Sequence, residues 1–170
     1  MDYNNILNQA RRLAGKNNLV VFDLKTIEYK QAWQLQSDLA QLAKNICCQG
    51  FLLLLEHYPV ITIGSNRSRD NLISSPETLK LKKIGLVQSN RGGDITFHGP
   101  GQLVGYPIIN LNLFSKDISL YVWRLEQILI DTLKYYCLPA YRIPGQRGVY
   151  VDRQKIASLG IKVKRWVTMH

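Results

Sequence analysis

Cysteine and histidine are scarce in this sequence, which contains three of each among its 170 residues. Cys47, Cys48 and Cys137 form neither a Cys-x-x-Cys pair nor an even disulfide set, a usage typical of a reducing compartment. None has a sequence neighbour that would activate it as a thiolate, so we interpret all three as structural, packed thiols. The histidines stand singly along the chain, and their spacing predicts no metal site.

Long apolar runs are also missing. The longest, residues 51–55, falls far short of the roughly 18 residues that a membrane-spanning helix needs. Residues 1–18 lack the apolar core and cleavage site of a secretory signal, and Asp2 is unusual for a transit peptide. We therefore expect a cytoplasmic protein with no membrane partner.

Acidic residues are outnumbered by basic ones, which gives a formal net charge of +10 and a pI near 9.7. Such a charge favours an acidic partner, whether nucleic acid, an anionic membrane or an acidic carrier protein. Two short basic clusters are most simply solvated faces: Lys80, Lys82 and Lys83, and Lys162, Lys164 and Arg165. No dense basic run or nucleic-acid motif is present, so we expect no nucleic-acid partner.

Hydrophobic periodicity predicts the main elements. Apolar side chains recur every three or four residues over positions 29–46, which predicts an amphipathic helix: Tyr29, Ala32, Leu35, Leu39, Leu42 and Ile46. Residues 51–55 then predict a fully buried strand, residues 60–63 a second extended segment, and residues 66–76 a loop. Residues 103–111 are expected to be extended, but Pro107 has no amide hydrogen, which predicts an edge strand or a bulge there.

The C-terminal part predicts a helix followed by a hairpin. Asp117 or Ser119 can cap the helix, its stripe is Val122, Leu125, Leu129, Leu133 and Tyr136, and Pro139 marks its end. Residues 148–151 and 155–167, joined by a polar link at 152–154, predict the hairpin. Strands interrupted by a few long helices favour an α+β fold, with one mixed sheet flanked by helices in a single domain over residues 1–170.

The segment Arg-Gly-Gly-Asp-Ile-Thr-Phe-His-Gly-Pro-Gly-Gln, residues 91–102, has the most distinctive composition. Gly92 and Gly93 permit positive φ and close approach of a ligand, and their amides can form a cradle for an anion or carbonyl. Arg91 can supply a cation, and Thr96 and His98 can direct polar groups at an acyl carbonyl. The alternative is a glycine-rich hairpin connection with a surface histidine.

Lys155 is the most informative single residue. If residues 155–163 form one regular strand, Lys155 shares a face with Ala157, Leu159, Ile161 and Val163. An amine held among apolar groups can act as a base or as the charge partner of a thiolate. The alternative is a strand-end lysine whose ammonium reaches back to water.

Glu56 and His57 follow the buried strand directly. Side chains often enter a site at such a position, but the simpler expectation is a strand-end pair that faces solvent.

Residues 91–102, residues 148–163 and the terminal His170 together resemble the lipoyl(octanoyl) transferase family, with weaker agreement over residues 56–64. The resemblance covers most of residues 20–170 and implies the fold of biotin and lipoate protein ligases. It also implies an acyl pocket lined by Arg91, Gly92, Gly93, Asp94, Ile95, Thr96, Phe97, His98, Ser158, Leu159 and Gly160.

The resemblance further implies a mechanism. In the family, the lysine that matches Lys155 lowers the pKa of a catalytic cysteine, which takes octanoyl from acyl carrier protein and passes it to a lysine of a lipoyl domain. That cysteine follows a His-Gly pair, and His170 matches the histidine of the pair, so the catalytic domain is expected to lack its C-terminal segment and this chain to transfer no octanoyl group. The implied partners are acyl carrier protein and the lipoyl domains of 2-oxoacid dehydrogenases and the glycine cleavage H protein, with no cofactor.

Two other functions fit the same residues less well. An ATP-dependent lipoate or biotin ligase would need a phosphate-binding loop and a metal site, and no convincing one is found in the sequence. A noncatalytic module that binds an acyl group or a carrier protein is the other alternative.

Overall fold

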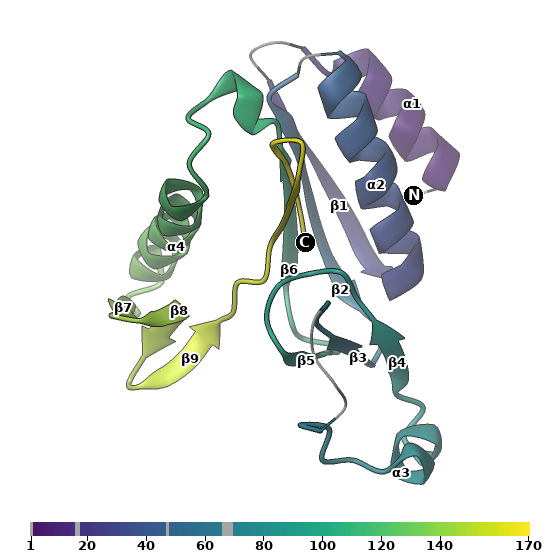
Figure 1. The fold of residues 1–170 in the computed structure, drawn as a ribbon, viewed down its shortest axis with the longest axis vertical. Helices are drawn as coiled ribbons and strands as arrows, with labels where there is room; N and C mark the ends of the chain where they lie inside the picture. Colours follow the sequence, from purple (N-terminus) through teal and green to yellow (C-terminus); the bar gives the residue numbers. More distant parts are fainter. Residues whose placement is uncertain (1, 16–17, 47, 66–69) are drawn as a thin grey trace. The chain divides into compact units, whose positions relative to one another are not determined.

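The computed structural model describes residues 2–15, 18–46, 48–65 and 70–170. Cys47 and residues 66–69 of the expected loop lie outside this range. The chain forms two compact units, one from Met1–Phe114 with Ile161–His170 and one from Ser115–Gly160 (Figure 1). Whether both units belong to one domain, as expected from the sequence, stays a prediction. No helix within the described stretches has the length and apolar character needed to cross a membrane.

The first unit combines helices with short mixed sheets. Its elements are α1 (Tyr3–Leu13), β1 (Leu19–Ile27), α2 (Tyr29–Asn45), β2 (Gly50–His57), β3 (Val60–Ile63), α3 (Pro76–Leu81), β4 (Gly85–Gln88), β5 (Ile95–His98), β6 (Val104–Ile109), the 3-10 helix η1 (Leu111–Leu113), β10 (Lys162–Lys164) and β11 (Val167–Met169).

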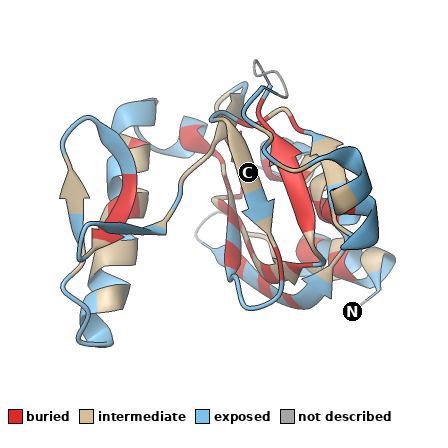
Figure 2. Ribbon diagram, turned by 90° about the horizontal axis from the view of Figure 1, so that it is seen from below, coloured by how far each residue is buried: buried red, intermediate tan, exposed pale blue. Residues whose placement is uncertain are grey.

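The main sheet of this unit has the order β1-β2-β6, with β1 parallel and β6 antiparallel to β2. Alternate residues of the three strands point to one face, where Phe51 pairs with Ile108 and Leu53 with Tyr106. Helices α1 and α2 cover this face, and the buried residues concentrate there (Figure 2). The opposite face is only partly covered. The expectation that residues 51–55 are fully buried is therefore wrong for alternate positions, such as Leu52.

Helix α2 confirms the predicted amphipathic helix almost residue for residue. Four of the six predicted stripe residues are buried, among them Leu35 and Leu39. Ile46 is 38% exposed because it lies just beyond the end of the helix, at its C-cap.

Strand β6 is the edge strand that Pro107 predicted. The nearby segment β11 supplies its missing partner through one side chain. The hydroxyl of Thr168 accepts from the Ile109 amide at 2.8 Å and donates to the Pro107 carbonyl at 2.8 Å. The Thr168 hydroxyl thus satisfies one backbone donor and one backbone acceptor on the free edge of β6, beside the proline that has no amide hydrogen.

The second sheet of the first unit has the order β4-β3-β5. Val60 pairs with His98 and Thr62 with Thr96, so these four side chains share one face. The preceding helix α3 is capped by Ser75, whose hydroxyl accepts from the Thr78 amide at 3.2 Å.

The second unit is one helix on a three-stranded antiparallel sheet. It contains α4 (Ile118–Tyr135), β7 (Tyr141–Ile143), β8 (Gln146–Val151) and β9 (Gln154–Ala157). Of the two caps that the sequence allowed, the structure selects Asp117, whose carboxylate accepts from the Leu120 amide at 2.9 Å. Tyr136 of the predicted stripe is exposed, because α4 ends one residue earlier.

The predicted hairpin exists, but its second strand is shorter than expected. Asp152 and Arg153 both have positive φ, which makes a two-residue turn of the type that joins tight hairpins. The second strand ends at Ala157, and residues 162–164 pair with β11 in another sheet. Residues 155–163 therefore do not form the single regular strand on which the apolar face of Lys155 depended.

Candidate functional site

The turn at residues 89–94 closes against the end of β3. The Gly64 amide donates to the Asp94 carbonyl at 3.0 Å, and the Ser65 amide donates to the Arg91 carbonyl at 3.0 Å. A Cβ at Gly64 would lie 1.9 Å from the Gly93 carbonyl oxygen, so this approach requires glycine. Gly93 itself has φ of +92°. The positive φ that the sequence allowed at both glycines of the pair is therefore found at Gly93 but not at Gly92.

Arg91 has a different role from the one expected. Its side chain is buried and points into the protein, where Nε and one terminal nitrogen donate to the Thr62 hydroxyl at 3.1 and 2.8 Å. The terminal nitrogens also donate to the carbonyls of Thr62, Gly92 and Asp94, each at 2.9 Å. The guanidinium thus stabilises the turn from its buried side, and its donors bond to protein oxygens rather than facing a ligand.

Only one of the two glycine amides expected to bind an anion or carbonyl is without a protein acceptor among the described residues. The Gly92 amide already donates to the Ile161 carbonyl at 3.2 Å. Gly93 is exposed, and the Asp94 carboxylate accepts from the Asn71 side chain at 2.6 Å. Gly93 is therefore the better candidate of the two for contact with a ligand.

Strand β5 carries the rest of the expected segment. Thr96 and His98 point to the face shared with Thr62, and Phe97 on the other face is 50% exposed. Residues 91–98 thus form one turn and strand, and their role in lining an acyl pocket stays a prediction.

All three histidines of the sequence meet beside this strand, although they are far apart along the chain. Their rings join those of three other aromatic residues in what we call the ring cluster: Tyr29, Trp33, His57, His98, Tyr106 and His170. Tyr29, Trp33 and Tyr106 were not predicted from the sequence as site residues. Within the described residues, no group of three or more potential ligands could hold a metal ion.

His57 is fully buried, so the expectation that it faces solvent is wrong. Its Nδ1 lies 2.9 Å from the Ile27 carbonyl, which can only accept, and its Nε2 lies 2.8 Å from the Tyr106 hydroxyl. Nδ1 therefore carries the proton and Nε2 accepts from Tyr106. Burial lowers the pKa of His57 and raises the pKa of Tyr106, which keeps both rings neutral.

His170 connects the ring cluster to the turn. Its Nε2 lies 2.6 Å from the Asn90 side-chain oxygen, and its amide donates to the buried Gln36 side chain at 2.8 Å. Burial, followed by the positive charges of Lys162 and Arg91, lowers the pKa of His170 to about 4. The Tyr29 hydroxyl adds a second link to the turn, because it donates to the Ser89 hydroxyl at 2.9 Å.

Lys155, Ser158, Leu159 and Gly160 belong to the second unit, and their arrangement with residues 91–98 stays a prediction. The expectation that Lys155 is enclosed by apolar groups is wrong for the described chain, where its side chain is exposed. Its stem passes over Gly148, and its ammonium lies 5.4 Å from the centroid of the Tyr150 ring.

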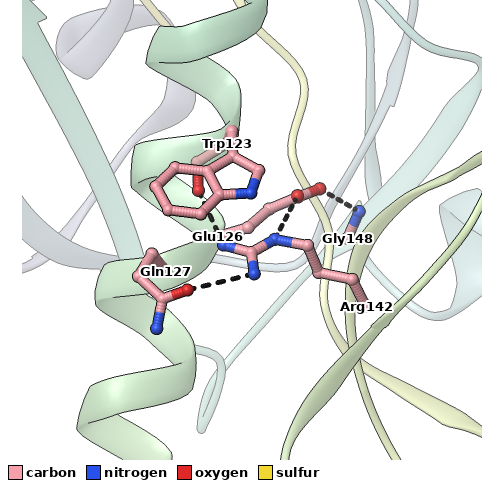
Figure 3. A network of polar contacts seen from close by, with 5 residues as sticks. All are labelled: Trp123, Glu126, Gln127, Arg142 and Gly148. Atoms are coloured by element: carbon pink, nitrogen blue, oxygen red, sulfur yellow. Dashed lines mark hydrogen bonds and ion pairs between the residues drawn. The ribbon is translucent and has the colours of Figure 1, made fainter.

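A partly buried polar network holds the hairpin of the second unit to α4 (Figure 3). The Glu126 carboxylate accepts from Arg142 at 3.0 Å and from the Gly148 amide at 3.0 Å. Arg142 also donates to the Trp123 carbonyl and stacks over the Trp123 ring. This network fixes the backbone directly beneath the stem of Lys155. A pocket of about 490 Å³ lies beside it, lined by residues of α4 and the β7–β8 turn.

The described cysteines have different surroundings. Cys48 is buried, as expected for a packed thiol, whereas Cys137 is exposed, so that part of the expectation is wrong. Cys137 follows the end of α4 with a φ of +61°, outside the helix that was to bury it.

Comparison with known structures identifies the fold. The structure is similar to that of lipoate-protein ligase A bound with ATP, with a TM-score of 0.66 and 14% identity over 91% of this chain and 64% of that chain. This likeness shows the lipoate ligase fold and confirms the predicted α+β class, with mixed sheets and flanking helices.

The sequence then identifies the family. Residues 28–170 match the lipoyl protein ligase A/B catalytic domain, and the chain belongs to that family. It is 45% identical over 153 residues to an octanoyltransferase of Solibacter usitatus, covering 90% of this chain and 70% of the relative. An octanoyltransferase of Clostridium kluyveri is 44% identical over 146 residues, or 86% of this chain and 63% of that protein. These relatives confirm the resemblance that residues 91–102 and 148–163 suggested.

Proposed function

We propose that this chain carries the acyl-binding part of an octanoyltransferase, which moves octanoyl from acyl carrier protein to the lysine of a lipoyl domain. The observation that carries the proposal is the identity of 45% to an octanoyltransferase over 90% of the chain. The ordered turn and strand at residues 91–98 support it, because they present an exposed Gly93 beside the polar face of β5.

The proposed chemistry is thioester exchange. A thiolate attacks the octanoyl thioester of the carrier, the carrier thiol leaves, and the lysine amine of the lipoyl domain then displaces the enzyme sulfur. None of Cys47, Cys48 and Cys137 lies in the sequence context of the family nucleophile, so we assign that role to a residue beyond His170. Lys155 is proposed to favour its thiolate form by charge.

The proposed protein partners agree with the charge. The net charge of +10 suits an acidic carrier, and the lipoyl domains of 2-oxoacid dehydrogenases and the glycine cleavage H protein are the proposed acceptors. These partners make the cytoplasm the proposed location.

The test is octanoyl transfer to a lipoyl domain, measured by the mass of its target lysine. Incubation with octanoyl carrier protein should modify the lysine when the chain extends past His170, and should not when it ends there. The reaction should need no ATP. Transfer by the 170-residue form would contradict the position of the nucleophile, and a strict need for ATP with free octanoate would indicate a ligase instead.

A further inference from the structure

The turn that follows β5 folds one side chain back onto His98. The Gln102 amide donates to the Gly99 carbonyl at 3.1 Å, and Gly101 adopts a φ of +84°. The Gly101 amide also donates to the Glu56 carboxylate on β2 at 2.9 Å. As a result, the Gln102 side-chain oxygen lies 2.6 Å from His98 Nδ1. The turn at residues 99–102 therefore serves to bring the Gln102 side chain to His98.

The imidazole of His98 lies against two other rings. Tyr29 stacks on it with a centroid distance of 6.2 Å and an interplanar angle of 21°. His57 meets it edge-on at 5.5 Å. These ring contacts fix the plane of the imidazole. The hydrogen bond to Gln102 then determines which of the two flipped orientations the ring adopts in that plane.

The contact with Gln102 also determines which nitrogen carries the proton. The Gln102 oxygen can only accept, so Nδ1 is the donor and Nε2 keeps its lone pair. Among the described residues, none bonds to Nε2, and the ring is only half-buried. His98 therefore presents a fixed, accessible proton acceptor at the end of the polar face of β5.

We propose that His98 is a catalytic residue that transfers the proton of the attacking amine to the leaving sulfur, and that Gln102 is its positioning residue. The proposal rests on the proposed function, which supplies the amine and the thioester. The attack forms the C–N bond and breaks the C–S bond. Nε2 takes one proton from the amine nitrogen and then gives it to the departing thiolate, so His98 ends as it began.

The surroundings of His98 suit this shuttle. Burial lowers its pKa, the Gln102 bond opposes that shift, and the positive charge of Arg91 lowers the pKa further. His57 is itself neutral, Tyr29 is kept neutral by a raised pKa, and Arg91 is the cation behind the turn. A neutral ring is therefore ready to accept at pH 7. Its imidazolium form is the acid that returns this proton to the departing thiolate.

The first test needs no enzymatic activity. Because the sequence has three histidines, long-range proton–nitrogen NMR spectra of the 170-residue chain can assign all of them with single histidine variants. We expect His98 to be protonated on Nδ1 at pH 7 and to titrate below the ordinary value. Gln102→Ala should release the ring to the mixture of tautomers found in free imidazole, whereas Gln41→Ala, an exposed glutamine on α2, should leave it unchanged. Protonation of His98 on Nε2, or no response to Gln102→Ala, would overturn the proposal.

The second test uses the transfer-competent extended chain with a preformed octanoyl-enzyme. Single-turnover transfer to the lipoyl domain should slow at least about 100-fold in His98→Gln. Gln102→Ala should slow it less and change its pH profile, while formation of the octanoyl-enzyme is preserved. An unchanged transfer rate in His98→Gln would overturn the shuttle. If the wild-type chain transfers no octanoyl group, the proposed function fails, and the tautomer measurement still decides whether Gln102 positions His98.

Discussion

The guanidinium of Arg91 makes five hydrogen bonds, all of them to neutral oxygens of Thr62, Gly92 and Asp94. A buried cation without a carboxylate partner is expensive unless every donor is used well. Its burial lowers its own pKa, and its charge contributes to the lowered pKa of His98 and His170. One side chain therefore shapes the turn and helps to keep the neighbouring rings neutral.

At the residue scale, Arg91→Ala should lower the free energy of unfolding by about 3 kcal/mol, because it leaves several buried oxygens without donors. Urea denaturation followed by tryptophan fluorescence measures this. The matched control is Arg12→Ala on the exposed side of α1, which should change stability by less than about 0.5 kcal/mol. Equal effects in the two variants would show that Arg91 does not brace the turn.

The sequence predicted some of these residues better than others. Gly93 and His98 were identified because glycine pairs and a lone histidine stand out within a short segment. His57 could not be placed, since its burial depends on Tyr106 and the Ile27 carbonyl, which come from other strands. Lys155 was misplaced because its expected face required a strand longer than β9.

At the scale of elements, periodicity worked where one face of a long helix meets a sheet. Helices α2 and α4 and the edge position of β6 follow from spacing, capping and Pro107. The short strands β4 and β5 are stabilised by pairing with β3 rather than by their own pattern, so local sequence carries little signal for them. The contact between β3 and the turn at residues 89–94 is equally nonlocal.

Gly64 provides the test of that contact between elements. Gly64→Ala places a methyl group 1.9 Å from the Gly93 carbonyl oxygen, and it should destabilise the protein by about 2 to 3 kcal/mol as the turn moves away from β3. Thermal unfolding measures the change. Gly105→Ala on β6 is the control, because its new Cβ would lie 3.8 Å from the nearest atom and should be neutral or slightly stabilising. A harmless Gly64→Ala would mean that the two elements do not pack closely.

For the whole molecule, the sequence predicted the family and the fold class correctly. The family and the α+β class followed from residues 91–102 and 148–163, and the comparisons confirm both. The gathering of all three histidines could not be predicted, because it requires the paths of α2, β2, β5 and β11 to converge. The chain spans 62 to 70% of the length of octanoyltransferase relatives.

The proposal that residues 91–98 bind the acyl group can be tested without the transfer reaction. The most direct test is to titrate the isotopically labelled 170-residue chain with a small octanoyl thioester, using an acetyl thioester as control. We predict saturable shifts of the Gly93 and Thr96 amides and of the His98 ring with the octanoyl thioester but not with the acetyl thioester. Shifts confined to the pocket beside Glu126 and Arg142, or no difference between the two thioesters, would contradict it.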